Sequence, residues 1–377
     1  MIISRTPFRI SFLGGGTDYP GWFREHGGSV LATTINRYCY ITCRFLPPFF
    51  EHKSRVVWSK IELVNGQQEV THPIIREVLA YLGIDEGIEI HHEGDLPARS
   101  GLGSSSAATV GILHALYALR GDMVSKSTLA RDAIHVEQVL LKESVGVQDQ
   151  IETAFGGLNR IDIAPDGSFQ VRPVVIGDAR IRALEHNLLL FYTGIARHAS
   201  TVAAEQISAI PNKQHELHEM QAMVDQGIEI MVGNGDLADF GRLLHEAWLL
   251  KRSLSDKIAP AFVDEVYERA RRAGALGGKL LGAGGGGFIL FVVRPQDHPK
   301  VLAALSELLV VPVELDRAGT QIIFYDPPRY SRTAHFRRDY QRYDVGNGDD
   351  NGHDNGDVVS PPAGMAKRDR DPDATSE

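Results

Sequence analysis

Four consecutive glycines, in the stretch Lys279-Leu-Leu-Gly-Ala-Gly-Gly-Gly-Gly287, constrain the fold of this chain more than any other feature. Glycine loses more backbone entropy on ordering than any other residue, so this run would weaken the interior of a helix or a strand. The run suits a loop whose backbone must approach another group closely. The sequence therefore predicts a close-contact loop at 282–287.

A second run of small residues, Ser100-Gly-Leu-Gly-Ser-Ser-Ser-Ala-Ala108, leads straight into the alanine-rich stretch 107–119, for which we expect a helix. Free amides at a helix N-terminus, preceded by glycines and hydroxyls, form an anion site. We therefore expect a phosphate cradle made by Gly101, Leu102, Gly103, Ser104, Ser105, Ser106 and Ala107. Two such loops in one chain predict a ligand that carries phosphate.

The charge of the chain is unevenly distributed. Nine acidic and three basic residues lie in 344–377, so this segment holds two thirds of the net charge of −9. The segment is also rich in Gly, Asn, Asp and Pro and has little to bury, which predicts a disordered tail. The remainder of the chain is close to neutral, which argues against a nucleic-acid partner.

The sequence contains no signal for a membrane or for secretion. No apolar run among the 377 residues reaches the roughly 18 needed for a membrane span, and the first residues lack the apolar core of a secretion signal. We therefore expect a cytoplasmic protein without a membrane partner. Cys39 and Cys43 have no second pair to complete a zinc site, so we expect buried free thiols.

Local patterns predict an α+β chain of two domains. Segments dense in β-branched and aromatic residues predict strands at 2–13, 30–45, 56–64, 88–92, 188–192, 286–293, 311–315 and 321–325. Apolar residues on a helical period predict helices at 73–82, 127–141, 197–209, 213–232, 236–252, 260–273 and 298–309, and a short element at 147–155. We place the domains at 1–185 and 186–333, followed by the tail at 334–377.

Three stretches together resemble the motifs of the GHMP kinase superfamily, which includes galactokinase, homoserine kinase, mevalonate kinase and phosphomevalonate kinase. They are Pro7-Phe-Arg-Ile-Ser-Phe-Leu-Gly-Gly-Gly-Thr-Asp-Tyr19, Pro97-Ala-Arg-Ser-Gly-Leu-Gly-Ser-Ser-Ser-Ala-Ala108 and Lys279-Leu-Leu-Gly-Ala-Gly-Gly-Gly-Gly-Phe288. The resemblance covers nearly the whole chain except the tail. It implies the GHMP kinase fold, a ribosomal protein S5 domain 2-like N-terminal domain joined to a ferredoxin-like C-terminal domain, and a kinase that uses ATP and Mg²⁺.

Within that resemblance, Ser105 and Glu137 match the hydroxyl and the carboxylate that contact the metal ion. Magnesium takes few protein oxygens and keeps several waters, so two such ligands suffice. Ser104 and Ser106 stay open as alternatives to Ser105, because motif spacing does not fix which serine points inward. Without the family, Glu137 would be interpreted as a solvated carboxylate on a helix face.

The segment Gly146-Val-Gln-Asp-Gln150 resembles the catalytic segment of galactokinase-type members, which makes Asp149 the expected base for the acceptor hydroxyl. A carboxylate in a dry cleft needs a neighbouring cation to stay ionised. Arg9, in the first motif, matches the family arginine that supplies this charge and helps to neutralise the transferred phosphoryl group.

The end of the first motif is expected to bind the acceptor. Asp18 matches the galactokinase residue that binds sugar hydroxyls, and a carboxylate can accept from two neighbouring hydroxyls. Thr17 belongs to the same motif and is assigned to the acceptor as well. Gly15 and Gly16 stand where galactokinases carry Glu-His, which opens volume beside the acceptor. The resemblance therefore favours a sugar larger than galactose.

This version of the motif, Gly14-Gly-Gly-Thr-Asp-Tyr-Pro20, resembles the branch that phosphorylates the C1 anomeric hydroxyl of D-glycero-D-manno-heptose 7-phosphate. A 7-phosphate would need cations of its own, because charge-assisted hydrogen bonds hold phosphate. We select Arg197 first, since it follows a strand and a Thr-Gly turn. The other candidates are Lys251, Arg252 and Lys257, while Lys279 either reaches the phosphates or packs beside its glycine loop. The resemblance also assigns Gly284 and Gly285 to the acceptor site.

Two other functions stay open. A kinase for an unphosphorylated sugar such as L-fucose would carry the same motifs. A non-catalytic sensor of sugar and nucleotide could use the same scaffold, but Arg9, Glu137 and Asp149 argue against it, because binding alone needs no base. A dinucleotide-binding Rossmann fold is excluded, since Gly101-Leu-Gly103 lacks the third glycine. A homodimer also stays open.

Overall fold

The computed structural model describes residues 1–47, 49–195 and 199–327, and its contacts group residues 1–332 into one compact unit. The predicted tail at 334–377 and the predicted phosphate ligand Arg197 lie outside the described residues. The predicted domain boundary at 185/186 falls at the end of helix α6 (Asp178–His186), and it stays a prediction.

In the described part of the chain, two long antiparallel strands, β1 (Ile2–Leu13) and β2 (Gly28–Phe45), organise a nine-stranded sheet. Its main path runs β13 (Gln321–Tyr325), β1, β2, β5 (Ile88–Gly94), β3 (Ser54–Val57) and β4 (Ile61–Val64). Strands β6 (Leu158–Ile163), β7 (Phe169–Pro173) and β12 (Leu315–Asp316) join beside this path. Because β2 has 18 residues, it pairs with β6 near its beginning and with β5 near its end.

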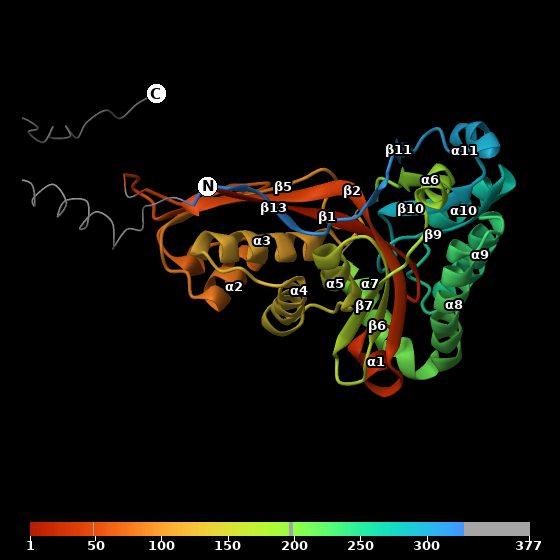
Figure 1. Cartoon of the computed structure of the whole chain (residues 1–377), viewed down its shortest axis with the longest axis horizontal. Coiled ribbons are helices and arrows are strands. Elements are labelled where there is room, and N and C mark those ends of the chain that lie inside the picture. The colour runs from red at the N-terminus through yellow and green to blue at the C-terminus, as the bar shows by residue number, and fades with distance from the viewer. Residues whose placement is uncertain (48, 196–198, 328–377) are drawn as a thin grey trace, which may run out of the picture. The chain divides into compact units, whose positions relative to one another are not determined.

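Four helices pack on one face of this sheet: α2 (Pro73–Leu82), α3 (Ser104–Arg120), α4 (Lys126–His135) and α5 (Gln148–Phe155) (Figure 1). Helix α3 lies closest to the strands, because small residues line its inner face. Gly111 lies against β1, where the Ser4 hydroxyl donates to its carbonyl at 2.8 Å, and an added Cβ would meet Thr6 Oγ1 at 3.0 Å. This packing fixes the N-terminus of α3 relative to β1.

The second half of the chain forms a four-stranded antiparallel sheet in the order β11 (Leu309–Val311), β8 (Leu188–Tyr192), β10 (Phe288–Val293) and β9 (Ala275–Leu280). All six residues of β10 are buried. Helices α9 (Ala238–Ser253) and α10 (Ala261–Arg272) pack against β9, and α8 (Gln214–Val232) bridges α9 and the first sheet (Figure 1). The remaining elements are α1 (Pro20–His26), α7 (Ala199–Ala209), α11 (His298–Ala304), the π-helical turn Val136–Leu140 and the short helices at Gln67–Glu69, Ile210–Asn212 and Pro295–Asp297.

After the second sheet the chain returns to the first, where β12 pairs with β2 and β13 with β1. The second sheet is therefore flanked along the chain by strands of the first sheet, while the two sheets share no strand pairing among the described residues. Within the described ranges, every helix is too short or too polar to cross a bilayer.

Several sequence predictions are confirmed with their ends within a few residues, among them β1, α2, β8 and the helices from α8 to α10. The predicted strand 56–64 is wrong in that a turn divides it into β3 and β4. The helix predicted from Ser127 begins at Lys126, because Ser125 is the residue whose hydroxyl caps the Thr128 amide. The helix predicted to Leu309 ends at Ala304. Cys39 and Cys43 are buried free thiols, as expected.

Candidate active site

A cavity opens where β1, the N-termini of α3 and α5, and the loop after β9 come together. Its lining includes residues from all three predicted motifs, from the segment before α5 and from α9. The charged and polar members are Arg9, Ser11, Asp18, Tyr19, Arg99, Ser104, Ser105, Ser106, Glu137, Glu143, Ser144, Gln148, Asp149, Gln206, Lys251 and Lys279. Residues that are far apart in the sequence therefore meet in one site.

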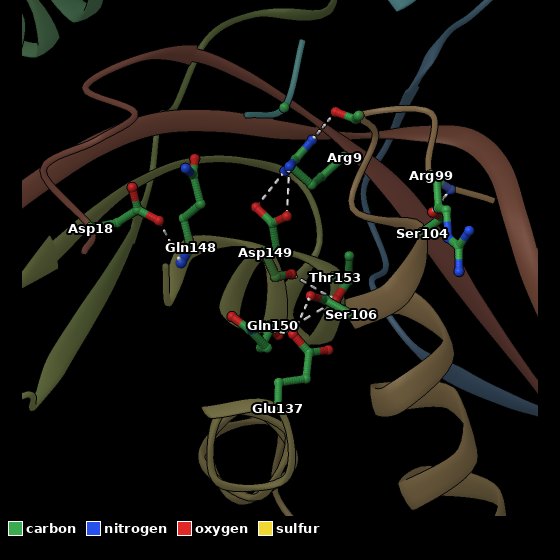
Figure 2. A network of polar contacts seen from close by, with 12 residues as sticks. Arg9, Asp18, Arg99, Ser104, Ser106, Glu137, Gln148, Asp149, Gln150 and Thr153 are labelled. Atoms are coloured by element: carbon green, nitrogen blue, oxygen red, sulfur yellow. Dashed lines mark hydrogen bonds and ion pairs between the residues drawn. The ribbon is translucent and has the colours of Figure 1, made fainter. Parts of the chain in front are cut away.

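Arg9 and Asp149 form a bidentate ion pair at the centre of this cavity (Figure 2). Arg9 Nε donates to Asp149 Oδ1 at 2.7 Å and Nη2 to Oδ2 at 2.6 Å, while Nη1 donates to the Gly101 carbonyl at 2.8 Å. The Arg9 side chain is 4% exposed and that of Asp149 26%, so the carboxylate remains reachable from the cavity. The pair therefore links β1, the α3 loop and α5, and it holds a charged carboxylate at the cavity surface.

Asp18 lies beside this pair and is fixed by main-chain amides. Gly16 N donates to Oδ1 at 2.9 Å, and the Gln148 amide faces Oδ2 at 3.4 Å (Figure 2). Burial raises the pKa of Asp18, and the negative charge of Asp149 acts in the same direction. Gly146 permits the arrangement, because a Cβ there would lie 1.8 Å from Asp18 Oδ2. Gly146, the glycine of the Gly-Val-Gln-Asp-Gln segment, thus makes room for the carboxylate of Asp18.

The phosphate cradle predicted at 101–107 is a tight loop that leads into α3. Gly101 and Gly103 have φ values of +84° and +71°, a backbone region that favours glycine, and Gly103 is the N-cap of the helix. The first amides of a helix have no partner within it, so the start of α3 offers N–H donors at the cavity. A side chain at Gly103 would also meet Arg9 Cγ at 3.0 Å.

Glu137 lies at the opposite side of the loop, on a π-helical turn (Val136–Leu140) that follows α4. Its Oε2 accepts from Ser106 Oγ at 3.0 Å and from Gln150 Nε2, whereas Oε1 is buried and has no hydrogen-bond partner among the described residues (Figure 2). Burial raises the pKa of Glu137 to about 7. An orphaned carboxylate oxygen in a dry site is a fitting ligand for a cation.

Ser106, rather than Ser105, is the serine that contacts Glu137. Ser106 is buried, while Ser105 is exposed and Ser104 accepts the Arg99 amide at 3.2 Å. Successive helical residues point about 100° apart, so only one of the three hydroxyls can face the π-helical turn. The assignment of the metal-contacting hydroxyl to Ser105 stays a prediction, and the contact with Glu137 favours Ser106, the alternative that the sequence left open.

The glycine run after β9 makes close contacts with protein backbone. A Cβ at Gly287 would lie 2.2 Å from the Ser100 carbonyl oxygen, and Phe288 N donates to that oxygen at 3.0 Å. Gly284 packs against Ile258, and Gly285 N donates to the Ile258 carbonyl at 2.9 Å. Gly282 and Ala283 line the cavity, and Gly284 and Gly285 support them from behind. The run thus locks the second sheet onto the phosphate loop.

Thr17 is placed differently from its neighbours Gly15, Gly16 and Asp18, which line the cavity. Its side chain is fully buried, and its hydroxyl donates to the Gly14 carbonyl at 2.8 Å and accepts from Ser29 N at 3.2 Å. Thr17 therefore closes the turn after β1 and is not among the cavity-lining residues, and its assignment to the acceptor stays a prediction.

Sequence reasoning missed several cavity residues, among them Ser11 and Gln148. The Ser11 hydroxyl and Gln148 Oε1 are buried without a hydrogen-bond partner among the described residues, and both side chains flank Gly15. Ser11 follows Arg9 by two positions on β1 and so shares its face, which is the one signal that could have found it. Both are free to bind polar groups of an acceptor.

The comparisons with known proteins agree with this geometry. The model for the GHMP kinases N terminal domain matches residues 69–157, and that for the GHMP kinases C terminal matches residues 228–311. The chain therefore carries matches to both the N- and C-terminal domains of GHMP kinases, and the predicted fold class and the prediction of a kinase are confirmed.

Among its relatives is the D-glycero-alpha-D-manno-heptose 7-phosphate kinase of Campylobacter jejuni, 25% identical over 317 residues, which are 81% of this chain and 93% of that protein. The Bifunctional fucokinase/GDP-fucose pyrophosphorylase of Arabidopsis thaliana is 25% identical over 78% of this chain, and this match covers 30% of the plant protein. A crystal structure of a D-glycero-D-manno-heptose 1-phosphate kinase from Bacteroides thetaiotaomicron is 26% identical, with a TM-score of 0.70 over 86% of this chain and 99% of the other.

Proposed function

We propose that this protein transfers the γ-phosphoryl group of ATP to the C1 anomeric hydroxyl of D-glycero-D-manno-heptose 7-phosphate, giving heptose 1,7-bisphosphate. The observation that carries the proposal is the bidentate Arg9–Asp149 pair, which lies between the phosphate loop and the pocket around Asp18. In this arrangement the phosphate loop holds the phosphates of ATP, Asp18 holds sugar hydroxyls, and the base Asp149 lies between them.

The chemistry follows from this order. Asp149 accepts the proton of the attacking hydroxyl through a lone pair that Arg9 leaves free, since each carboxylate oxygen can accept more than one hydrogen bond. The acceptor oxygen forms a bond to the γ-phosphorus as the bond to the ADP oxygen breaks. Arg9 offsets the negative charge on the transferring group. The amides at the start of α3 bind the remaining phosphate oxygens.

Glu137 and Ser106 fit a magnesium site in that arrangement. Glu137 Oε1 is buried and unpartnered, and a single carboxylate with a hydroxyl suits an ion that keeps waters and nucleotide phosphates as its other ligands. Among the described residues, no three His, Cys, Asp or Glu side chains gather as a metal site of their own. A bound magnesium ion would neutralise charge on the phosphates of ATP.

The acceptor is inferred from the pocket and from the relatives. Gly15 and Gly16 leave the space beside Asp18 without polar side chains of their own, and Ser11 and Gln148 offer unpartnered groups around it. The similarity to a protein named heptose 7-phosphate kinase over 93% of its length supports a heptose phosphate. The likeness to a heptose 1-phosphate kinase supports the heptose and leaves the position of the existing phosphate to experiment.

A second candidate is phosphorylation of an unphosphorylated sugar such as L-fucose, which the similarity to two fucokinase-containing proteins favours. An ADP-release assay with ATP and magnesium separates the candidates. The acceptors are D-glycero-D-manno-heptose 7-phosphate, the 1-phosphate of the same heptose, sedoheptulose 7-phosphate, mannose, L-fucose and galactose. Selective turnover of heptose 7-phosphate is expected, and selective turnover of L-fucose would replace the proposal with the second candidate.

A further inference from the structure

Two buried lysines face the acceptor side of the cavity without an acidic partner. Lys251 of α9 and Lys279 of β9 line the cavity, and their exposed fractions are 6% and 3%. Lys279 Nζ donates to the Phe12 carbonyl at 2.8 Å, and Lys251 Nζ donates to the Gly282 and Leu280 carbonyls. Neither ammonium group forms an ion pair within the described parts of the chain.

The surroundings place both ammonium groups near Asp18 rather than near Glu137. Phe12 follows Ser11, which flanks Gly15 in the acceptor pocket. Burial lowers the pKa of Lys251 to about 8 and that of Lys279 well below its ordinary value, and the charge of Arg9 adds to both shifts. The charge of Asp18 opposes both shifts. The charge of Asp149 also opposes the shift of Lys251, but Asp149 is paired with Arg9, whereas Asp18 has no cation at ion-pair distance among the described residues.

Two of the other basic candidates for a second phosphate, Arg252 and Lys257, are already neutralised, while Arg197 lies outside the described residues. Arg252 Nη2 lies 2.8 Å from Asp264 Oδ2, and Lys257 pairs with Glu205 at the surface. Lys251 and Lys279 differ because main-chain carbonyls orient them and leave N–H donors free, since an ammonium group has three. A buried cation without a counter-charge costs several kcal/mol, so the site gains from an anionic ligand.

We propose that Lys251 and Lys279 form an anion subsite that binds a phosphate group already carried by the acceptor. This inference rests on the proposed function and extends it, because it makes the enzyme selective for sugar phosphates over free sugars. Phosphate is also what ATP would present, so the test must separate the acceptor phosphate from the γ-phosphate.

The test uses Lys251→Met and Lys279→Met in the full chain, with Lys257→Met as the matched surface control. Removing one charge-assisted hydrogen bond should raise KM for heptose 7-phosphate about 10- to 100-fold. The Kd values for ATP and ADP, measured by calorimetry, should change less than about twofold, and Lys→Arg at either position should recover part of the lost affinity. Lys257→Met should match the wild type in all of these measurements.

Two results would overturn the subsite. Weaker ATP binding with unchanged ADP binding would assign the lysines to the γ-phosphate, and an unchanged KM for heptose 7-phosphate in both variants would remove them from recognition. If the wild-type enzyme does not turn over heptose 7-phosphate, that result contradicts the proposed function itself, and it is distinct from the two results that contradict the subsite.

If either variant fails to fold, the wild type still tests the subsite. Inorganic phosphate should compete with heptose 7-phosphate and not with ADP, and competition with ADP alone would contradict the inference.

Discussion

The two walls of the cavity carry charge in different ways. On the wall made by β1, α3, α5 and the π-helical turn, side chains bind one another: Arg9 forms an ion pair with Asp149, and Glu137 accepts hydrogen bonds from Ser106 and Gln150. On the wall made by α9 and β9, Lys251 and Lys279 are held by main-chain carbonyls and face no carboxylate at ion-pair distance in the described chain.

We interpret this difference as a difference in role: the Arg9–Asp149 pair takes part in the reaction, and Lys251 and Lys279 bind a ligand. A neutralised pair is already in its working arrangement and costs little to maintain, as a preorganised catalytic centre requires. An ammonium group oriented by carbonyls retains binding capacity, and its charge is offset when an anion arrives. The account therefore expects chemistry and sugar binding to depend on the first wall and recognition of the acceptor phosphate on the second.

The first wall is tested most severely by Asp149→Asn. This change keeps the shape of the side chain but removes the base, so kcat should fall about 10²- to 10⁴-fold while ATP binding is retained. Steady-state ADP release and calorimetry measure the two quantities. Asp122→Asn, at the exposed end of α3, is the control. If Asp149→Asn keeps near-wild-type kcat, the base lies elsewhere and the contrast between the walls fails.

The metal assignment on the same wall is sharpened by a matched pair of serine variants. Ser106→Ala should raise the magnesium concentration for half-maximal activity by about 10-fold or more, because Ser106 contacts the metal carboxylate Glu137. Ser105→Ala should leave it unchanged, since that side chain is exposed. A magnesium titration of initial rates measures this concentration for both variants. A larger increase in Ser105→Ala than in Ser106→Ala would assign the metal-contacting hydroxyl to Ser105.

The junction of the walls is tested by Gly287→Ala. The new methyl group would lie 2.2 Å from the Ser100 carbonyl oxygen at a φ of +98°, so we expect a loss of about 3 kcal/mol or more in unfolding free energy. Gly121→Ala has a similar φ of +85° and open space, and should cost about 1–2 kcal/mol. Chemical denaturation compares them, and equal losses would show that packing against Ser100 contributes nothing.

The smallest expected effect concerns Glu152, which is buried on α5 one turn after Asp149 and bonded by Asn159. Burial raises its pKa from 4.5 to about 8, so between these values the folded state holds a proton that the unfolded state releases. The unfolding free energy should therefore fall as pH rises through this window. Glu152→Gln should flatten that slope, whereas exposed Glu25→Gln should not. Thermal melts from pH 5 to 8.5 measure the pH dependence of stability in each variant. An unchanged slope in Glu152→Gln would contradict the raised pKa of Glu152.

The sequence predicted the first wall far better than the second, for a physical reason. The α3 loop, Asp18 and the Gly-Val-Gln-Asp-Gln segment are short contiguous motifs, so residue type and spacing carry their chemistry. Which serine faces Glu137 depends on rotation about α3 and on the π-helical turn, which spacing does not encode. Lys251 was predicted only as one of several helix cations, because its burial depends on packing between α9 and β9.

The glycine runs show the same limit. Both were predicted to approach a phosphate-bearing ligand, yet Gly284, Gly285 and Gly287 pack against Ile258 and Ser100. The run at 101–107, which leads into helix α3, presents backbone amides to the cavity. The run at 282–287, which precedes strand β10, packs against other parts of the protein. The pairing of β13 with β1 could not be predicted either, because a local sequence pattern does not show which distant segments pair.

The most direct test of the central claim is the identity of the phosphorylated oxygen. Heptose 7-phosphate would be incubated with ATP, magnesium and the wild-type protein, and the product analysed by ¹H–³¹P correlation NMR. The account predicts stoichiometric ADP and a new phosphate coupled to the anomeric proton, beside the original 7-phosphate. A new phosphate on another oxygen, or no transfer to this acceptor, would contradict it.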